Sequence, residues 1–292
     1  MHNRYKTLSI KDFGLQLLET QDLDPVYNVL TQLDWDQDKV KRWLLGYWCF
    51  YHCGIASWLS DFEDQYWFDH ACNLVLNQQG GCPVEIPASD VWPRGKERRH
   101  FRGKKALDAL QYVSMEFKRP EAAVDFMIAS DTLEGITERV KTVPQFGPWI
   151  AFKIADMAER VLGYETEFQP NGVMMFKDPK EAALRLYLQL KEGVDPSLKS
   201  SNYLDWRPGE KERGIELAIS HLEVIFSNHL APPVFDRGVN IQEIETILCK
   251  WKSHCNGHYP FNNDIDEISH GLSDWAEENN SANDFLREMK RI

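Results

Sequence analysis

The chain has 292 residues, of which 43% are hydrophobic and 12% are aromatic, so it can bury a sizeable core and is not intrinsically disordered. Its net charge of −12 argues against nucleic-acid binding by the surface as a whole, although a local group of cations can still bind phosphate. The N-terminus lacks the apolar segment of a secretory signal, no stretch is apolar enough to span a membrane, and the six cysteines form no CxxC pair, so we expect a cytoplasmic protein with reduced thiols.

Apolar residues recur at helical spacing along most of the chain, which favours an all-α fold. The longest such run predicts a single helix over 36–58, with Trp43, Tyr47 and Tyr51 on one face. The dipeptide Asn171-Gly172 is typical of a β-hairpin, but the runs beside it are too short to support a sheet. Further helices are expected at 10–19, 25–33, 62–78, 103–117, 120–129, 131–141, 148–162, 178–192, 210–228, 240–255, 264–277 and 281–290.

The segment WPRGKERRHFRGKK, residues 92–105, carries seven Lys or Arg residues against one acid, and we call it the arginine loop. The planar fork of arginine suits paired contacts with phosphate. Trp92, His100 and Phe101 can stack on an unpaired base. The alternative is a solvated basic loop that pairs with the many acids of this protein.

Residues 143–156 predict a tight turn between two helices. Gly147 gives the turn freedom, and Pro148 pre-sets the backbone for the first helical position. The free N–H groups at such a helix start, together with the helix dipole, form a site for an anion, and DNA phosphate is its natural ligand. The alternative is an ordinary corner between two helices.

Residues 191–209 form a long irregular stretch, and we predict the domain boundary there. This boundary divides the chain into an N-terminal helical region, 1–200, and a C-terminal helical region, 201–292. We expect the second region to complete a binding cleft. A single domain is the alternative.

Polar and aromatic residues are dense over 254–263, which indicates a pocket between two helices. His254, Cys255 and His258 match no standard zinc spacing. Asp264 and Asp266 can serve simply as caps of the helix that follows.

The turn at 143–151 resembles the helix-hairpin-helix of the DNA glycosylase superfamily, which implies a glycosylase-like helical fold with added helices. Val143, Pro144, Phe146, Gly147 and Ala151 match its pattern, whereas Gln145 stands where the first glycine is expected. The catalytic aspartate expected downstream is absent, and Trp149 stands at the position of the catalytic lysine. Base excision by the usual chemistry is therefore not expected.

Residues 92–103, 144–156 and 248–268 together resemble the α-glutamyl/putrescinyl thymine pyrophosphorylase family, which are phage amino acid:DNA transferases. The resemblance implies that the amine of an amino acid or polyamine displaces phosphate or pyrophosphate from activated 5-hydroxymethyluracil in double-stranded DNA, in the cytoplasm of an infected bacterium. The target base must be flipped out of the duplex. No cofactor is expected; a divalent metal would help to hold a pyrophosphate, but no specific ligand set is evident.

Roles for individual residues follow from this resemblance. Arginines would neutralise the leaving group, and His100, Asp156 and Asp264 are alternative general bases. The catalytic candidates are Arg98, Arg99, His100, Arg102, Asp156 and Asp264; the DNA-binding candidates are Arg94, Gln145, Gly147, Trp149, Lys153 and Asn171; and the substrate-binding candidates are Trp92, Phe101, Lys250 and Lys252. We expect the arginine loop and the helix start at Pro148 to face a common cleft.

Two other functions stay open at this point. One is a glycosylase-like or lyase-like repair enzyme that uses Lys153 or a displaced carboxylate, and the other is a non-catalytic DNA-binding protein.

Overall fold

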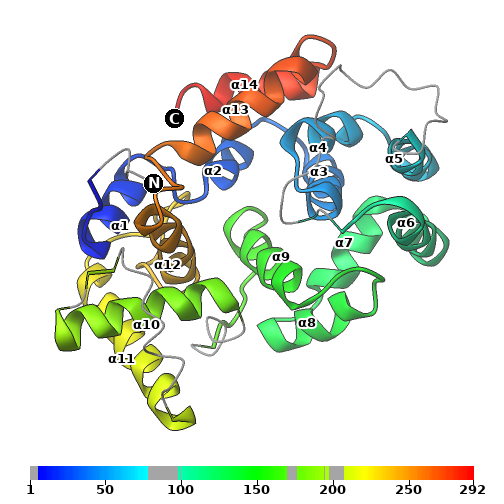
Figure 1. Cartoon of the computed structure of the whole chain (residues 1–292). Coiled ribbons are helices and arrows are strands. Elements are labelled where there is room, and N and C mark those ends of the chain that lie inside the picture. The colour runs from blue at the N-terminus through cyan, green and yellow to red at the C-terminus, as the bar shows by residue number, and fades with distance from the viewer. Residues whose placement is uncertain (1–5, 78–97, 99, 170–175, 194, 197–206) are drawn as a thin grey trace. The chain divides into compact units, whose positions relative to one another are not determined.

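A computed structural model describes residues 6–77, 98, 100–169, 176–193, 195–196 and 207–292 (Figure 1). The described residues form α-helices joined by turns, with isolated β-bridges at Thr132–Glu167 and Leu230–Gly238 and no β-strand. The predicted all-α fold is confirmed. None of the described helices is long and apolar enough to cross a membrane.

The helices lie close to the predicted ranges. Their bounds are α1 (Ile10–Glu19), α2 (Pro25–Gln32), α3 (Gln37–Phe50), α4 (Cys53–Ser60), α5 (Asp64–Asn77), α6 (Gly103–Phe117), α7 (Pro120–Ile128), α8 (Leu133–Lys141), α9 (Pro148–Arg160), α10 (Lys177–Glu192), α11 (Pro208–Phe226), α12 (Ile241–Cys255), α13 (Asn263–Ala276) and α14 (Asn280–Met289).

The chain forms two compact units, and each is discontinuous in sequence. Unit 1 comprises Met1–Asn28 and Phe168–Asp264, and unit 2 comprises Val29–Glu167 and Ile265–Ile292. The range 191–209, where a boundary was expected, falls inside unit 1. The three divisions between the units fall within α2, between α9 and α10, and within α13.

The core of unit 1 joins α1, α10, α11 and α12 around large apolar side chains. Trp251 and Phe226 are fully buried there. A side chain at Gly14 would have its Cβ 2.4 Å from the Phe226 ring, so glycine lets α1 approach α11 closely. Ser9 begins α1 by accepting a hydrogen bond from the Asp12 amide.

The core of unit 2 surrounds α3, which is buried from Val40 to its end. The prediction of one helix over 36–58 is wrong, because the helix breaks after Phe50. Tyr51 has a left-handed φ of 52°, and His52 begins α4 by accepting a hydrogen bond from the Ile55 amide at its Nδ1. The helical spacing of apolar residues continues through this break, so the spacing alone does not reveal where α3 ends.

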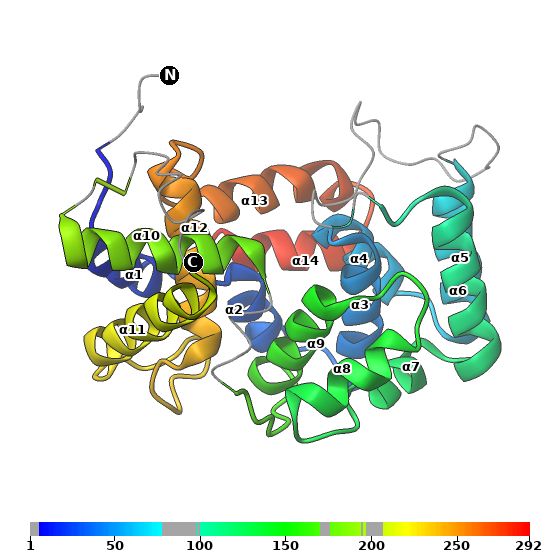
Figure 2. The ribbon, with the colours of Figure 1, turned by 60° about the horizontal axis from the view of Figure 1, so that its bottom comes forward.

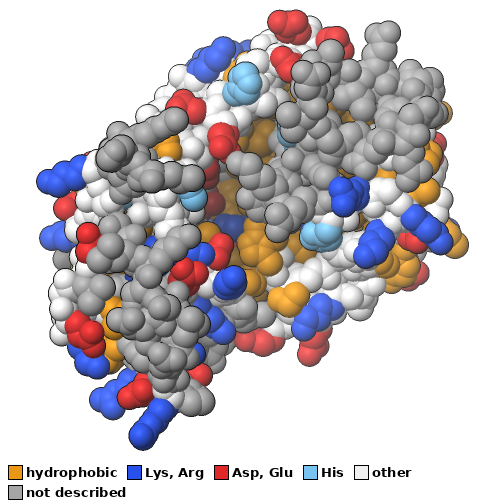
Figure 3. All heavy atoms as spheres, viewed as in Figure 1, with side chains coloured by type: hydrophobic (Ala, Val, Ile, Leu, Met, Phe, Trp, Pro, Cys, Tyr) orange, Lys and Arg blue, Asp and Glu red, His pale blue; other side chains and the backbone are white. Residues whose placement is uncertain are grey.

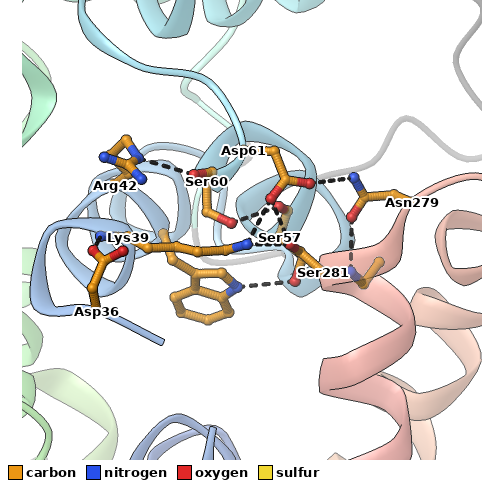
Figure 4. Close-up of polar contacts among 10 residues, drawn as sticks. Asp36, Lys39, Arg42, Ser57, Ser60, Asp61, Asn279 and Ser281 are labelled. Carbon is orange, nitrogen blue, oxygen red and sulfur yellow. Dashed lines mark hydrogen bonds and ion pairs between the residues drawn. The ribbon is translucent and has the colours of Figure 1, made fainter. Parts of the chain in front are cut away.

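The C-terminal helix α14 is fastened to α3 and α4 by a polar network around Asp61 (Figure 4). The carboxylate accepts hydrogen bonds from Lys39 Nζ at 2.7 Å, Ser281 Oγ at 2.5 Å and Asn279 Nδ2 at 2.7 Å. Burial favours the neutral acid, but these donors outweigh it and hold the pKa of Asp61 below its ordinary value. Elsewhere in unit 2, α5 packs beside α6, and α8 and α9 form a helical hairpin (Figure 2).

Candidate nucleic-acid interface

The α8–α9 hairpin in unit 2 ends in an open helix start. Gly147 is the N-cap of α9, Pro148 is its first residue, and no side chain caps the helix. A Cβ added to Gly147 would meet no atom of the described residues within 4 Å, so a side chain has room at this position. Such amides, with the positive end of the helix dipole, can bind an anion.

Gln145, at the position where the resemblance expects a glycine, takes a backbone conformation that glycine enters freely. Its φ is +67°, in the left-handed region that side chains disfavour. The Phe146 amide donates to the Val143 carbonyl oxygen at 3.1 Å and closes the turn. The turn therefore keeps a glycine-like geometry although glutamine occupies the position.

Arg98 connects the arginine loop to this turn. Its Nη1 donates to the carbonyl oxygen of Gln145 at 3.0 Å, and its Nε donates to the carbonyl oxygen of Cys49 in α3 at 3.2 Å. Its guanidinium carbon lies 4.8 Å from the ring centres of both Phe101 and Phe146. This side chain joins the described end of the arginine loop, residues 98 and 100–105, to the hairpin.

Arg98 is a buried cation, with 1% of its surface exposed. Burial lowers its pKa to about 10, so it stays charged at neutral pH. Within the part of the chain that the structure describes, it has no carboxylate partner, and its buried Nη2 makes no hydrogen bond. A side chain held in this way is placed to shape the turn and not to meet a leaving group in solvent.

Phe101 also lies in the core. Its exposed fraction is 1%, and its ring packs edge-on against Phe50, with centres 5.6 Å apart. The ring is thus enclosed and is not on a surface where a base can stack, in contrast to the expectation from the sequence.

The start of α6 carries the exposed cations of the arginine loop. Arg102 is the N-cap, and Lys104 and Lys105 lie in the first turn, which holds no acid. Among the described residues these three side chains make no ion pair with a carboxylate. In Figure 3, Lys and Arg side chains lie over the region that Figure 1 labels α6. Cations at the positive end of a helix dipole reinforce its attraction for phosphate.

Trp149, the second residue of α9, lies at the end of an aromatic row. Its ring centre is 5.1 Å from that of Tyr51. Tyr51 stacks on Tyr47 at 4.4 Å, and Tyr47 stacks on Trp43 at 4.9 Å. This row ties the start of α9 to α3.

Lys153 and Asp156 lie on the buried face of α9. They are 8% and 2% exposed, and Lys153 Nζ is 3.6 Å from Asp156 Oδ2. Both groups were candidates for contact with substrate or DNA, but the structure places them inside unit 2 as a pair.

In unit 1, Lys250 and Asp264 also form a pair, with Lys250 Nζ 2.7 Å from Asp264 Oδ2. Lys250 further donates to the carbonyl oxygen of Asp22, and its ammonium lies 5.1 Å from the Tyr259 ring centre. Burial favours the neutral form of Asp264, but Lys250 outweighs it and holds the pKa of Asp264 below its ordinary value. A carboxylate with a lowered pKa is a weak base.

Lys252 is held between two carboxylates of α10. Its Nζ lies 2.5 Å from Asp178 and 3.0 Å from Glu181. Burial opposes the charged form, but these acids outweigh it and raise the pKa of Lys252. Its charge is therefore already neutralised.

His254 uses both of its ring nitrogens within unit 1. The Leu8 amide donates to Nε2 at 3.2 Å, so Nδ1 carries the proton and donates to the Tyr259 carbonyl oxygen at 2.8 Å. No lone pair is left for zinc. Across the described residues, no group of three or more His, Cys, Asp or Glu side chains is arranged to hold a metal ion.

Four predicted site residues, Trp92, Arg94, Arg99 and Asn171, lie outside the described residues. Sequence reasoning missed the bridging contacts of Arg98, since no local signal distinguishes one arginine of this loop from its neighbours.

Most of the chain is similar to known proteins, which include a family of transferases and two transferases of phages. Residues 18–258 match the family model described as amino acid:DNA transferase. The chain is 40% identical over 300 aligned positions to a glycinyltransferase of Pseudomonas phage PaMx11, covering all of this chain and 99% of that protein. It is 27% identical over 265 positions to a putrescinyltransferase of Delftia phage PhiW-14, covering 89% of this chain and 76% of that protein.

Proposed function

The chain belongs to the amino acid:DNA transferase family, and from this premise we propose that it attaches glycine through its amine to an activated 5-hydroxymethyluracil in double-stranded DNA. The observation that carries the choice of glycine is the 40% identity, over the whole chain, to a phage glycinyltransferase. The relative named for putrescine is less similar, at 27% identity.

The proposed reaction is a displacement at the exocyclic methylene carbon of the base. The glycine nitrogen forms a bond to this carbon, while the carbon–oxygen bond breaks and its electron pair leaves with phosphate or pyrophosphate. One proton passes from the attacking amine to a base. Cations beside the leaving oxygens stabilise the negative charge that develops on them.

The described geometry supports distinct roles for the two anion-binding elements. The amides at the start of α9, which no side chain caps, would hold a DNA phosphate. Arg102, Lys104 and Lys105 would contact neighbouring phosphates or the leaving group, because they are exposed at the start of α6.

Among the three candidate bases, His100 has the most favourable position. Its residue is exposed and its Nε2 lies 3.3 Å from Arg98 Nη1, whereas Asp156 is buried beside Lys153 and Asp264 is paired with Lys250. Lys250 and Lys252, the candidates for the carboxylate of glycine, are both already paired within unit 1, Lys250 with Asp264 and Lys252 with two carboxylates of α10.

The direct test is incubation of the purified protein with glycine and duplex DNA that contains phosphorylated or pyrophosphorylated 5-hydroxymethyluracil. Mass spectrometry of the digested nucleosides should show glycine in place of the leaving group. Putrescine in equal concentration measures the choice of amine. An abasic site would instead indicate a glycosylase, and unchanged nucleosides would indicate a DNA-binding protein without this activity.

A further inference from the structure

We propose that Arg98 is a positioning residue that holds Gln145 in its left-handed conformation and thereby sets the direction of the α9 N-terminus. The inference rests on the proposed function, in which that N-terminus holds a DNA phosphate. It assigns to Arg98 a role through the backbone and not through contact with substrate.

The backbone at Gln145 needs support from outside the turn. With φ at +67°, glutamine is in a region that glycine enters freely and that other residues disfavour. Gln145 lies two residues before the N-cap Gly147, so a change in its conformation would turn the first amides of α9.

Arg98 supplies that support from a fixed position. The two hydrogen bonds to the carbonyl oxygens of Gln145 and Cys49 come from one planar guanidinium, so the turn is held relative to α3. The rings of Phe101 and Phe146, each 4.8 Å from the guanidinium carbon, restrict the side chain further.

The need to fill a buried volume does not by itself explain why residue 98 is an arginine. A buried cation loses its hydration, and in the described part of the structure no carboxylate compensates Arg98. An apolar side chain would fill the same volume without that loss. Methionine, however, has no donor for the two carbonyl oxygens, and this difference is what the test uses.

The test is a double-mutant cycle with Arg98→Met and Gln145→Gly. Arg98→Met should weaken binding to duplex DNA about tenfold, because the phosphate site is misdirected. Gln145→Gly alone is the reference, and its affinity is the value with which the double variant is compared. In the double variant, glycine adopts the left-handed conformation without help, so most of the lost affinity should return, whereas the melting temperature should stay low because the two carbonyl bonds remain absent.

A matched control separates this rescue from a general effect of glycine. Lys118 ends α6 with φ at +60°, so Lys118→Gly relieves the same kind of backbone strain at another site. It should not restore DNA binding to Arg98→Met. If Arg98→Met does not fold, Arg98→Lys replaces it, because lysine keeps the charge but lacks the planar fork that reaches both oxygens.

One further variant distinguishes failure of this inference from failure of the proposed site. Gly147→Asp places a carboxylate in front of the α9 amides. If it abolishes DNA binding and Gln145→Gly still fails to rescue Arg98→Met, then Arg98 does not act through Gln145. If Gly147→Asp binds DNA normally, the hairpin is not the phosphate site and the inference about Arg98 falls, whereas the proposed function is tested separately by the transfer of glycine to DNA.

Discussion

The guanidinium of Arg42 lies 2.7 Å from a carboxylate oxygen of Glu121 within unit 2, where only 9% and 4% of the two side chains are exposed. Arg42 also donates from Nε to the carbonyl oxygen of Ser60 at 2.9 Å. This buried pair therefore connects α3 to α7 and to the end of α4.

Replacing Arg42 by methionine should lower the free energy of unfolding by about 3 kcal/mol, because the buried Glu121 carboxylate loses its 2.7 Å partner and keeps only the exposed Arg119, at 3.6 Å. The control is Arg287→Met. Arg287 is exposed and pairs with Asp284 at 3.2 Å and with Glu288 at 3.5 Å, and Glu288 keeps Arg291 at 2.7 Å, so the loss of Arg287 should cost about 0.5 kcal/mol or less. Urea unfolding measures both values, and equal losses in the two variants would contradict the prediction.

Gly147→Asp should weaken DNA binding about tenfold or more, because a carboxylate would occupy the site of the phosphate. The same change should raise the free energy of unfolding by about 0.5 kcal/mol, because aspartate is a good N-cap. Gly147→Ala fits the same open space without charge and should bind DNA almost normally. Fluorescence anisotropy with a labelled duplex gives the affinities. An equal loss for alanine and aspartate would mean that bulk, not charge, matters.

A double variant with Lys104→Glu and Lys105→Glu should show a weaker salt dependence of DNA binding than the original protein. The slope of log affinity against log salt should become less steep by about 0.9 for each phosphate contact that is lost. The control pair Lys11→Glu and Lys290→Glu changes the net charge equally at exposed positions outside α6. Similar slopes in both double variants would show that overall charge, not the start of α6, governs binding.

His52 should make the protein less stable in acid. Burial lowers the pKa of His52 to about 4 from 6.5, so the unfolded chain takes up a proton more readily than the folded chain between these values. The stability contributed by neutral His52 is complete above pH 6.5 and is lost as the pH falls towards 4, by about 2–3 kcal/mol.

His52→Asn isolates this effect. Asparagine can still accept the hydrogen bond from the Ile55 amide that begins α4, but it does not titrate. The variant should therefore show a flatter dependence of unfolding free energy on pH across this window. An unchanged pH profile would assign the acid sensitivity to other groups.

Where the sequence carries local signals, it predicts this fold well. The periodic run at 103–117 gives α6 with both ends as observed, and Thr132 begins α8 by accepting a hydrogen bond from the Gly135 amide. Gly163 after α9 has the left-handed φ of 74° that a glycine at this place indicates. In each case, neighbouring residues determine the geometry.

The missed features depend on contacts between distant segments. The break at Tyr51 depends on tertiary packing, since Gly54 lies so close to Trp275 that an added Cβ would be 2.4 Å from the indole. Likewise, a run of arginines predicts exposure for all of its members. Only the folded structure distinguishes Arg98, which is enclosed, from Arg102, which is exposed.

The interleaving of the two units has a consequence for biosynthesis. On the ribosome, α1 emerges long before α12, against which it packs, so the first 28 residues must wait for the segment Phe168–Asp264 before their core can close. Unit 2 in turn lacks α14 until the chain is nearly finished. A fragment cut at residue 200 would leave both cores open, so neither half of the polypeptide is a self-sufficient folding module.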